Sequence, residues 1–395
     1  MNKVVFLFLI IPILFSCNEK KVRNQHNGVL REIRLKDIES NRIEEDDVFN
    51  SIHFVKLETT DSCLIDQIEQ ISVYENSFYI LDKKENLFVF DKRGKFIRKI
   101  GHKGPGPEEY IGATMFYIHP TKKYISLFNG DIGVVRYDLQ GKYLTRLKLN
   151  LKSNVLTDQC SLIDEKNVLI ENSNSRRFSP YHYIGLSENN MQETNQYFLM
   201  PSLADENCAI GQYAMNNNAG NNFYVVTLYN DTIYRWNKDC FVPEYILESG
   251  LKHPCPKEIK RHEPYRFIGD AEKVLNKNGF STGFQKIFST DEYLCLDYGG
   301  LGYFDMIIWE KKPNKGYLYR FSGSDNPLLH IYNNWMTTSD CALVRHMSVS
   351  LLIDSEKEIR ATNHPEVPEL YKNLKEDDNP VLVLYDYDKL LSRFK

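Results

Sequence analysis

Two neighbouring stretches of this 395-residue chain repeat one pattern of short strands around a turn, and this repeat restricts the possible folds most. Each unit is expected to form two strands, a turn of the form Asp-x-x-Gly and a third strand. Asp91 corresponds to Asp138 and Gly94 to Gly141, so the units lie 47 positions apart (138 minus 91, and 141 minus 94). The aspartate of such a turn hydrogen-bonds the backbone and the glycine accepts a positive φ, which favours a β-hairpin. The predicted strands are 77–82, 87–91 and 95–101 in the first unit, and 124–128, 134–138 and 142–144 in the second.

Weaker copies of this unit continue along the chain, and together they predict a β-propeller. Units of about 40–60 residues that hold several short antiparallel strands are typical of propeller blades. One four-stranded sheet cannot bury both of its faces, whereas a ring of sheets packs face to face and hides most edges. The further predicted strands are 167–171 and 181–186, 222–226 and 231–236, 293–298 and 316–321, and finally 381–385.

We therefore predict an all-β fold, a six-bladed β-propeller of four-stranded antiparallel blades. About 330 residues divided by roughly 50–60 residues for each blade gives six blades. Residues 52–57 and the C-terminal strand are expected to complete one blade from the two ends of the domain. The 25 tyrosines and 22 phenylalanines suit half-buried strands. The clearest helical pattern, at 257–279, predicts a short insert that covers one mouth of the ring.

The N-terminal residues predict export and a lipid anchor. A short basic start is followed by an almost unbroken apolar run, 4–14, and then by Phe15, Ser16 and Cys17. This order is typical of a secretory signal peptide, and residues 14–17 resemble the lipobox of bacterial lipoproteins, although Phe15 is bulkier than usual. The resemblance implies that Cys17 is the lipid attachment site and the new N-terminus. The alternatives are a chance cysteine after an ordinary signal peptide, or an uncleaved anchor helix. The run is too short for a helix to span about 30 Å of hydrocarbon.

The predicted organisation has three parts. Residues 1–16 form the lipoprotein signal peptide, 17–29 a flexible polar tether, and 30–395 the propeller. Membrane association would then come from lipid on Cys17, and several acyl chains make such anchoring stable. The neutral Asn18 after this cysteine favours the outer membrane, by analogy with lipoproteins.

Charge and candidate metal ligands exclude some functions. The chain has 49 basic and 53 acidic residues and a net charge of -4, with the two signs interspersed. A basic nucleic-acid-binding face is therefore not expected. The acidic run 44–47 lacks the spacing of an EF-hand loop and predicts a short helical turn on the surface. No histidine pair has the spacing of metal ligands, so neither a metal nor a cofactor is expected.

The cysteines after Cys17 are interpreted as mostly reduced structural residues. Their spacings are wide and irregular, and no C-x-x-C pair suggests zinc or redox chemistry. Cys295, between two leucines, is typical of a cysteine that acts as a small buried apolar residue. One disulfide stays possible in an exported chain. The seven are Cys63, Cys160, Cys208, Cys240, Cys255, Cys295 and Cys341.

Two glycine-rich motifs invite catalytic interpretations that their context does not favour. Residues 101–107 lack the Gly-Lys-Ser/Thr ending of a phosphate-binding loop and suit a connection between blades better. Residues 279–283 fit the G-x-S-x-G pattern around a nucleophilic serine, Ser281. That motif needs a strand before the serine and a helix after it. Here the helical pattern comes first and the strand-like stretch 284–288 follows, which favours a chance match.

Aromatic residues give the remaining candidates for a binding site. Flat aromatic faces with polar rims can stack on sugar rings, but aromatic residues that alternate along strands are more often blade core. The flexible stretch 299–302, rich in glycine, permits a close backbone approach and makes the fifth blade the preferred ligand mouth. The predicted ligand-binding residues there are Tyr298, Tyr303 and Trp309. The wider set adds Tyr181, Tyr183 and Trp335.

A family resemblance rests on stretches in a fixed order behind the leader, which are 54–60 with 64–65, 68–71, 88–96, 100–110, 230–234 and 379–384. These stretches resemble six-bladed β-propeller lipoproteins of Bacteroidetes-type bacteria, a family mostly of unassigned function. The likeness is best from Phe54 to Leu144 and weakest at about 150–218. It implies the fold and the anchor, and it supplies no catalytic residue.

Three functions stay open on the sequence alone. The leading hypothesis is a non-enzymatic, lipid-anchored propeller of the cell envelope that binds a glycan, a peptide or a partner protein. The alternative is a channel-centred enzyme such as a polysaccharide lyase, glycosidase or lactonase. A glycosidase needs two carboxyl groups at a defined separation, and a lactonase-like propeller needs a central cation. The third possibility is a structural envelope subunit without a small ligand.

Overall fold

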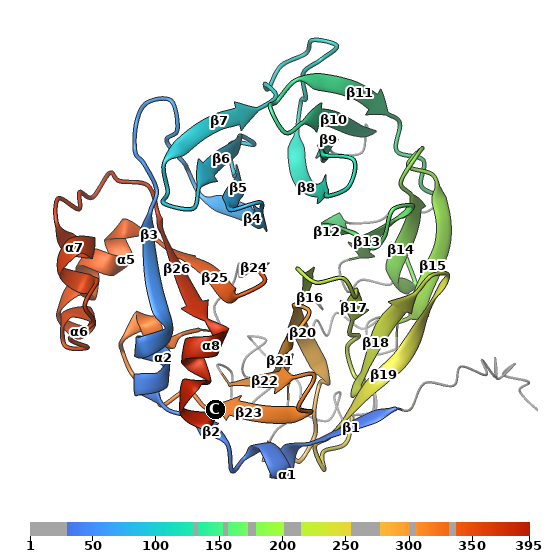
Figure 1. Cartoon of the computed structure of the whole chain (residues 1–395). Coiled ribbons are helices and arrows are strands. Elements are labelled where there is room, and N and C mark those ends of the chain that lie inside the picture. The colour runs from blue at the N-terminus through green and yellow to red at the C-terminus, as the bar shows by residue number, and fades with distance from the viewer. Residues whose placement is uncertain are drawn as a thin grey trace, which may run out of the picture.

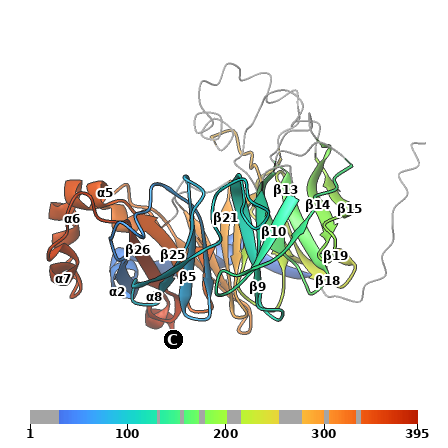
Figure 2. The ribbon, with the colours of Figure 1, turned by 90° about the horizontal axis from the view of Figure 1, so that it is seen from above.

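The computed structural model confirms the predicted six-bladed β-propeller. Six sheets stand around a central axis, each with one edge strand near the axis and the other at the rim (Figure 1). Seen from the side, the ring is a flat disc whose strands run between its two faces (Figure 2). The structure describes residues 30–129, 133–152, 157–172, 179–200, 215–253, 277–299, 305–331 and 337–395. The predicted leader and tether therefore lie outside the described residues.

Blades 1 to 3 are each built from four consecutive antiparallel strands, as the repeat predicts. Blade 1 contains β4 (Ile68–Tyr74), β5 (Ser77–Asp82), β6 (Leu87–Asp91) and β7 (Phe96–Ile100). Blade 2 contains β8 (Ala113–His119), β9 (Tyr124–Asn129), β10 (Gly133–Asp138) and β11 (Tyr143–Leu147). Blade 3 contains β12 (Thr157–Leu162), β13 (Asn167–Asn172), β14 (Tyr181–Ser187) and β15 (Glu193–Leu199).

Blades 4 to 6 each receive a strand from the N-terminal end of the domain. Blade 4 combines β17 (Tyr224–Val225), β18 (Thr232–Asn237) and β19 (Cys240–Glu248) with β1 (Arg31–Arg34). Blade 5 combines β16 (Met215–Asn218), β20 (Phe284–Ser289), β21 (Tyr293–Tyr298), β22 (Met306–Glu310) and β23 (Lys315–Tyr319) with β2 (Arg42–Ile43). Blade 6 combines β24 (Thr337–Thr338), β25 (Ala342–Met347) and β26 (Val381–Asp386) with β3 (Ile52–Lys56). Blade 5 thus has six strands, not the predicted four, because β16 and β2 flank its four antiparallel strands.

Residues 31–56, here called the strap, run along the outer rim of three successive blades (Figure 1). The strap consists of β1, α1 (Leu35–Ile38), β2, α2 (Glu45–Ser51) and β3. β1 pairs in parallel with β19, β2 in parallel with β23, and β3 antiparallel with β26. The predicted closure of one blade from both ends is confirmed by β3 and β26. The strap is fixed by buried apolar side chains, which include Ile33, Ile38, Ile43 and Val48.

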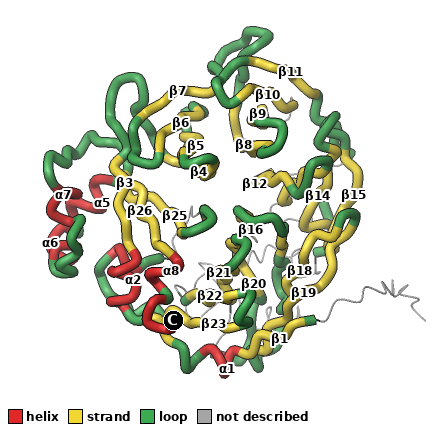
Figure 3. Tube along the Cα trace, viewed as in Figure 1, coloured by secondary structure: helices red, strands yellow, loops and turns green. Residues whose placement is uncertain are grey.

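Apart from α1, the described helices gather around blade 6 (Figure 3). α5 (Val349–Asp354), α6 (Glu356–Arg360) and α7 (Val367–Tyr371) lie between β25 and β26, and α8 (Tyr387–Leu390) follows β26. The described residues also contain two 3₁₀ turns, η3 (Pro327–Leu329) and η4 (Ser392–Phe394). The helical turn predicted at 44–47 is present as the start of α2. The predicted insert at 257–279 falls mostly outside the described residues, whose gap here is 254–276.

The repeated Asp-x-x-Gly turns have the predicted geometry. Asp91 accepts hydrogen bonds through Oδ1 from the backbone N–H groups of Arg93 and Lys95, at 2.8 and 2.9 Å. Asp138 occupies the equivalent place and accepts the same two bonds from its own turn, at 2.9 and 2.8 Å. Gly94 and Gly141 follow with φ of 80° and 89°. The internal repeat in the sequence therefore corresponds to the same turn geometry in blades 1 and 2.

Asn379 joins the closing blade to blade 1. Its side-chain Nδ2 donates to the carbonyl oxygens of Glu58 and Cys63, at 2.7 and 2.8 Å, and its Oδ1 accepts from the N–H of Ile65 at 2.8 Å. Its backbone N–H donates to Thr59 Oγ1 at 2.8 Å. The buried amide thus uses both of its polar atoms. This contact connects stretches 54–65 and 379–384, which carry the family resemblance.

A buried carboxylate joins blades 2 and 3. Glu188 follows β14, is fully buried, and accepts hydrogen bonds from Lys122 Nζ at 2.9 Å and Tyr117 Oη at 3.3 Å. Tyr124 Oη and the Arg136 guanidinium also donate to it. Burial alone would raise the pKa of Glu188, but the bonds from Tyr124 and Lys122 and the charge of Arg136 hold it below its ordinary value. The carboxylate is therefore ionised and compensated inside the protein.

The glycines of the two turns predict a graded loss of stability. A Cβ on Gly94 would lie 2.0 Å from the carbonyl oxygen of Lys56, whereas a Cβ on Gly141 would lie 3.0 Å from that of Lys99. Both substitutions should lower the free energy of unfolding by about 1–2 kcal/mol, because a residue with a Cβ disfavours the left-handed backbone conformation. We expect Gly94→Ala to lose about 1–3 kcal/mol more than Gly141→Ala, because it overpacks the contact with blade 6. Urea unfolding of residues 18–395 measures both, and equal losses would contradict this account.

Removal of the buried Glu188 carboxylate should strongly destabilise the folded protein. Glu188→Ala leaves the Arg136 guanidinium buried without its partner, so we expect a loss of about 3–5 kcal/mol in the free energy of unfolding. The matched control is Glu356→Ala, which removes an exposed ion pair with Arg360 at 2.6 Å. An exposed pair of this kind contributes about 0.3–0.5 kcal/mol. A loss below about 1 kcal/mol for Glu188→Ala would show that the network is not a stabilising junction.

Candidate functional site

The predicted aromatic residues of blade 5 lie in its core. Tyr298 ends β21 and is 1% exposed, and Trp309 in β22 is 5% exposed. Both pack in the apolar cluster between blades 4 and 5 with Ile233 and Phe284. This is the arrangement expected for blade core, so neither ring offers an open face for stacking. Their role in ligand binding stays a prediction that their burial does not favour.

The other predicted residues fall in different places. Tyr183 is fully buried in blade 3, and Tyr181 is partly buried at the start of the same strand. Tyr303, Trp335 and the predicted lipid attachment site, Cys17, lie outside the described residues.

Ser281 does not have the surroundings of a hydrolase nucleophile. It is fully buried, and β20 rather than a helix follows it. Its Oγ accepts from the N–H of Gly283 at 2.9 Å. The G-x-S-x-G motif therefore forms the turn into an antiparallel strand, as the chance-match interpretation predicts.

Tyr298 belongs to a polar group at the junction of blades 4 and 5, here called the junction cluster. It comprises Asp231, Ser249, His253, Ser281 and Tyr298. The tyrosine hydroxyl donates to Asp231 Oδ1 at 2.7 Å and shares a 2.8 Å hydrogen bond with Ser249 Oγ. His253 Nε2 lies 3.2 Å from Asp231 Oδ2, and its Nδ1 lies 3.0 Å from the carbonyl oxygen of Ser281.

Both ring nitrogens of His253 make these contacts, so the cluster has a structural role. A histidine in this state donates to two oxygens when protonated. Burial alone would lower the pKa of His253, but the bonds to Asp231 and to the Ser281 carbonyl raise it above its ordinary value. The ion pair of His253 with Asp231 fixes residues 249–253 against blade 5. The backbone N–H of Ser281 contributes to this by donating to the Lys252 carbonyl at 2.8 Å.

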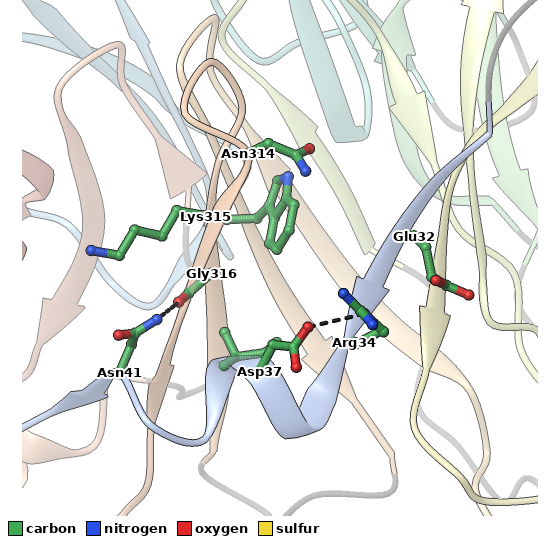
Figure 4. Close-up of a pocket in the computed structure, with 9 residues that line it drawn as sticks. Glu32, Arg34, Asp37, Asn41, Asn314, Lys315 and Gly316 are labelled. Atoms are coloured by element: carbon green, nitrogen blue, oxygen red, sulfur yellow. Dashed lines mark hydrogen bonds and ion pairs between the residues drawn. The ribbon is translucent and has the colours of Figure 1, made fainter.

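Trp309 marks a second feature, an open cleft between the strap and blade 5, here called the strap cleft (Figure 4). Its volume is about 190 Å³, which is smaller than the roughly 300–1,000 Å³ of typical small-molecule sites. The strap supplies one wall and the β22–β23 hairpin supplies the other. The lining residues are Glu32, Arg34, Asp37, Ile38 and Asn41 from the strap, and Trp309, Asn314, Lys315 and Gly316 from blade 5.

The local structure explains why this cleft is open and polar. In β1 the side chain of Ile33 is buried, so the alternation of a strand leaves Glu32 and Arg34 outside. Gly316 has no side chain, and a Cβ there would lie 2.3 Å from Ile38 and 2.8 Å from the Trp309 ring. The strap can therefore approach the hairpin closely only at a glycine.

The cleft combines both signs of charge with amide groups. Arg34 Nε and Asp37 Oδ2 form an ion pair at 2.9 Å, and Asn41 Nδ2 donates to the Gly316 carbonyl at 3.0 Å (Figure 4). The Lys315 side chain extends away from Asn314, and its ammonium lies over the Tyr317 ring at 5.1 Å (Figure 4). Trp309 Nε1 is buried, and no described atom accepts its hydrogen.

Nothing in the described ranges points to a metal centre or a membrane span. These residues contain no group of three or more His, Cys, Asp or Glu side chains placed to hold a metal ion. They also contain no helix that is long and apolar enough to cross a bilayer. Of the cysteines in these ranges, Cys63, Cys160 and Cys295 are buried free thiols, and burial raises the pKa of Cys295 to about 12.

Most residues of both features are absent from the sequence prediction. The sequence favours blade 5 for a ligand site, and two of its predicted residues lie in these features: Tyr298 belongs to the junction cluster, and Trp309 lines the strap cleft. Asp231 begins the predicted strand 231–236 and lies in the stretch 230–234 that carries the family resemblance, and neither feature identifies it as a site residue. The sequence pattern does not predict the strap strands β1 and β2, because strands of two or four residues are too short to show the alternation of apolar and polar residues.

The junction cluster predicts a pH-dependent contribution to stability. Since the pKa of His253 is raised in the folded protein, its contribution is full below the unfolded pKa of about 6.5. It is lost as pH rises through the higher folded pKa. We expect the stability difference between the wild type and His253→Gln to be largest at about pH 5 and to shrink towards pH 9. Urea unfolding across this range measures it, with the exposed His102→Gln as control. A difference that grows with pH would contradict the assignment.

Comparison with solved structures supports the fold. A protein of Bacteroides fragilis, named as a candidate exported protein, is 20% identical with a TM-score of 0.65, and the match covers 90% of this chain and 99% of that chain. A member of the DUF4221 family from Bacteroides vulgatus is 9% identical with a TM-score of 0.48, and the match covers 85% of this chain and 98% of that chain. The first shows the shared fold, and the second is too distant to carry an argument.

Family membership rests on a separate match. No curated protein matches this sequence significantly. Residues 30–386, nearly the whole propeller, match the family described as a domain of unknown function, DUF4934. The chain therefore belongs to the DUF4934 family.

Proposed function

We propose that this protein is a lipid-anchored binding protein of the bacterial cell envelope. In this proposal the acylated Cys17 holds the protein at the membrane, and the propeller recognises a glycan, a peptide or a protein partner. The name of the similar Bacteroides fragilis protein supports export. The basic, apolar and lipobox-like residues before Asn18 support anchoring.

One observation carries the proposal, namely that the strap begins directly after the predicted tether. Arg31 pairs with Tyr245 of β19 in blade 4, so the described part of the chain begins at the rim of the ring (Figure 1). Thirteen residues, 17–29, span at most about 45 Å when fully extended. An anchor of this length would hold the rim of blade 4 close to the bilayer, and both faces of the disc would stay open to a partner.

The rigid ring supports a role in recognition. Sites are placed accurately when rigid elements carry them, and the blades are joined by buried contacts such as Glu188 and Asn379. The strap cleft, which is open and lined by polar groups, lies beside the predicted tether in the sequence. A partner bound there would be kept at the membrane surface.

Replacement of the anchor residue tests the first half of this proposal. Cys17→Ser should release the protein from the membrane fraction and abolish incorporation of a labelled fatty acid, because the acyl chains are the proposed attachment. The matched control is Cys341→Ser, which removes an exposed thiol of the propeller and should change neither result. Cell fractionation and acyl labelling measure both variants. Membrane retention of Cys17→Ser equal to that of the wild type would refute anchoring through this residue.

A further inference from the structure

We propose that the strap cleft binds a neutral polyhydroxylated ligand, the ring of a carbohydrate, and that binding holds the strap on blade 5. This inference rests on the proposed function, because it assigns the ligand class of a binding protein.

The cleft has two walls that only the folded ring brings together. Arg34, Asp37 and Asn41 come from the strap, and Asn314 and Gly316 come from the β22–β23 hairpin. The walls meet at several points, which include the hydrogen bonds from Asn41 Nδ2 to the Gly316 carbonyl and from the Leu318 N–H to the Asn41 carbonyl, and the close approach of Ile38 to Gly316. A ligand between the walls would contact both, so its binding would be linked to the docking of the strap.

The charges of the cleft favour a neutral ligand. Glu32 and Asp37 carry two negative charges and Arg34 carries one positive charge, while the ammonium of Lys315 lies over the Tyr317 ring. An anionic ligand would face the two carboxylates, and a cationic ligand would face the guanidinium. A neutral ligand avoids both repulsions, which like charges otherwise impose on a complex.

The hydrogen-bonding groups favour hydroxyls. Carboxylates only accept, guanidinium groups and the indole N–H only donate, and amides do both. A hydroxyl can donate and accept, so adjacent hydroxyls of a sugar ring match Asp37, Arg34 and Asn314 without a change of protonation. Trp309 lines the cleft, and the buried hydrogen on its Nε1 lacks an acceptor among the described atoms. A hydroxyl oxygen that reached this group would satisfy it.

The strap is suited to stabilisation by a ligand because its pairing with blades 4 and 5 is short. β1 pairs with β19 over four residues, and β2 pairs with β23 over two. Short edge strands with few backbone bonds belong to the parts of a protein that open most readily. A ligand that bridges strap and blade would therefore slow this local opening.

Glycan binding tests the ligand class. Residues 18–395 are applied to an array of neutral, uronic-acid and amino-sugar glycans, and retention of the neutral class is expected. Asn314→Gly should weaken this retention at least about tenfold, because it removes the amide but permits the positive φ of 55° at this position. Asp37→Asn should shift preference towards uronic-acid glycans. The control Lys312→Ala alters an exposed side chain that does not line the cleft and should bind as the wild type does.

The outcomes separate this inference from the proposed function. Neutral glycan binding that Asn314→Gly and Asp37→Asn leave unchanged overturns the strap cleft as the site, while a binding protein remains. Retention of uronic-acid or amino-sugar glycans alone overturns the neutral class. If no glycan is retained, the ligand class proposed here is overturned, and capture of a peptide or protein partner would still support the proposed function.

Hydrogen exchange tests the link to the strap. With the retained glycan at saturation, exchange of the amides in β1 and β2 should slow at least about tenfold relative to the free protein. Amides of β5, far from the cleft in blade 1, serve as the internal control and should not change. Asn314→Gly, checked for an unchanged melting temperature, should abolish the protection. Binding without slower exchange in the strap would overturn the proposed coupling.

Discussion

Hydrogen bonding between β3 and β26 closes the ring, and the other blade contacts depend on this closure. A propeller hides its sheet faces only when the last blade meets the first. Here Phe54 pairs with Val383 across the closing sheet, and Asn379 ties the same sheet to the connection that leads into blade 1. The helices at 349–371 reinforce this junction, since Glu366 accepts from the N–H of Phe54 at 2.9 Å and contacts His53 at 2.8 Å.

The outer edges of the six sheets are protected in different ways. Exposed strand edges can pair with other chains, and native proteins cover or charge them. The strap covers the edges of blades 4, 5 and 6. In blade 1 the edge strand β7 carries Arg98 and Lys99, and Glu58 accepts from the N–H of Phe96 at 2.8 Å. In blade 2 the edge strand β11 carries Arg146. The strap therefore protects the sheet edges of blades 4, 5 and 6, and the strap cleft forms where it crosses blade 5.

The fold could be predicted further than the site, for a physical reason. Strands β5, β6, β9 and β10 are buried nearly throughout, and β6 and β10 end in Asp-x-x-Gly turns, so local sequence identifies them. β1, β2 and β16 depend on partners far along the chain, which local patterns do not reveal. The same limit applies to the site. Asp231, His253 and Ser281 approach one another only after blades 4 and 5 pack, and the prediction of exposed aromatic residues missed how completely the blades cover Tyr298 and Trp309.

The pairing of the strap has a consequence for the order of synthesis. Arg31 emerges early, yet its partner Tyr245 is made 214 positions later, and Val383 follows Phe54 by 329 positions (245 minus 31, and 383 minus 54). Contacts between such distant residues slow folding. The end nearest the proposed anchor is thus the first part translated and among the last to reach its place, which suits a chain that completes its fold after translocation.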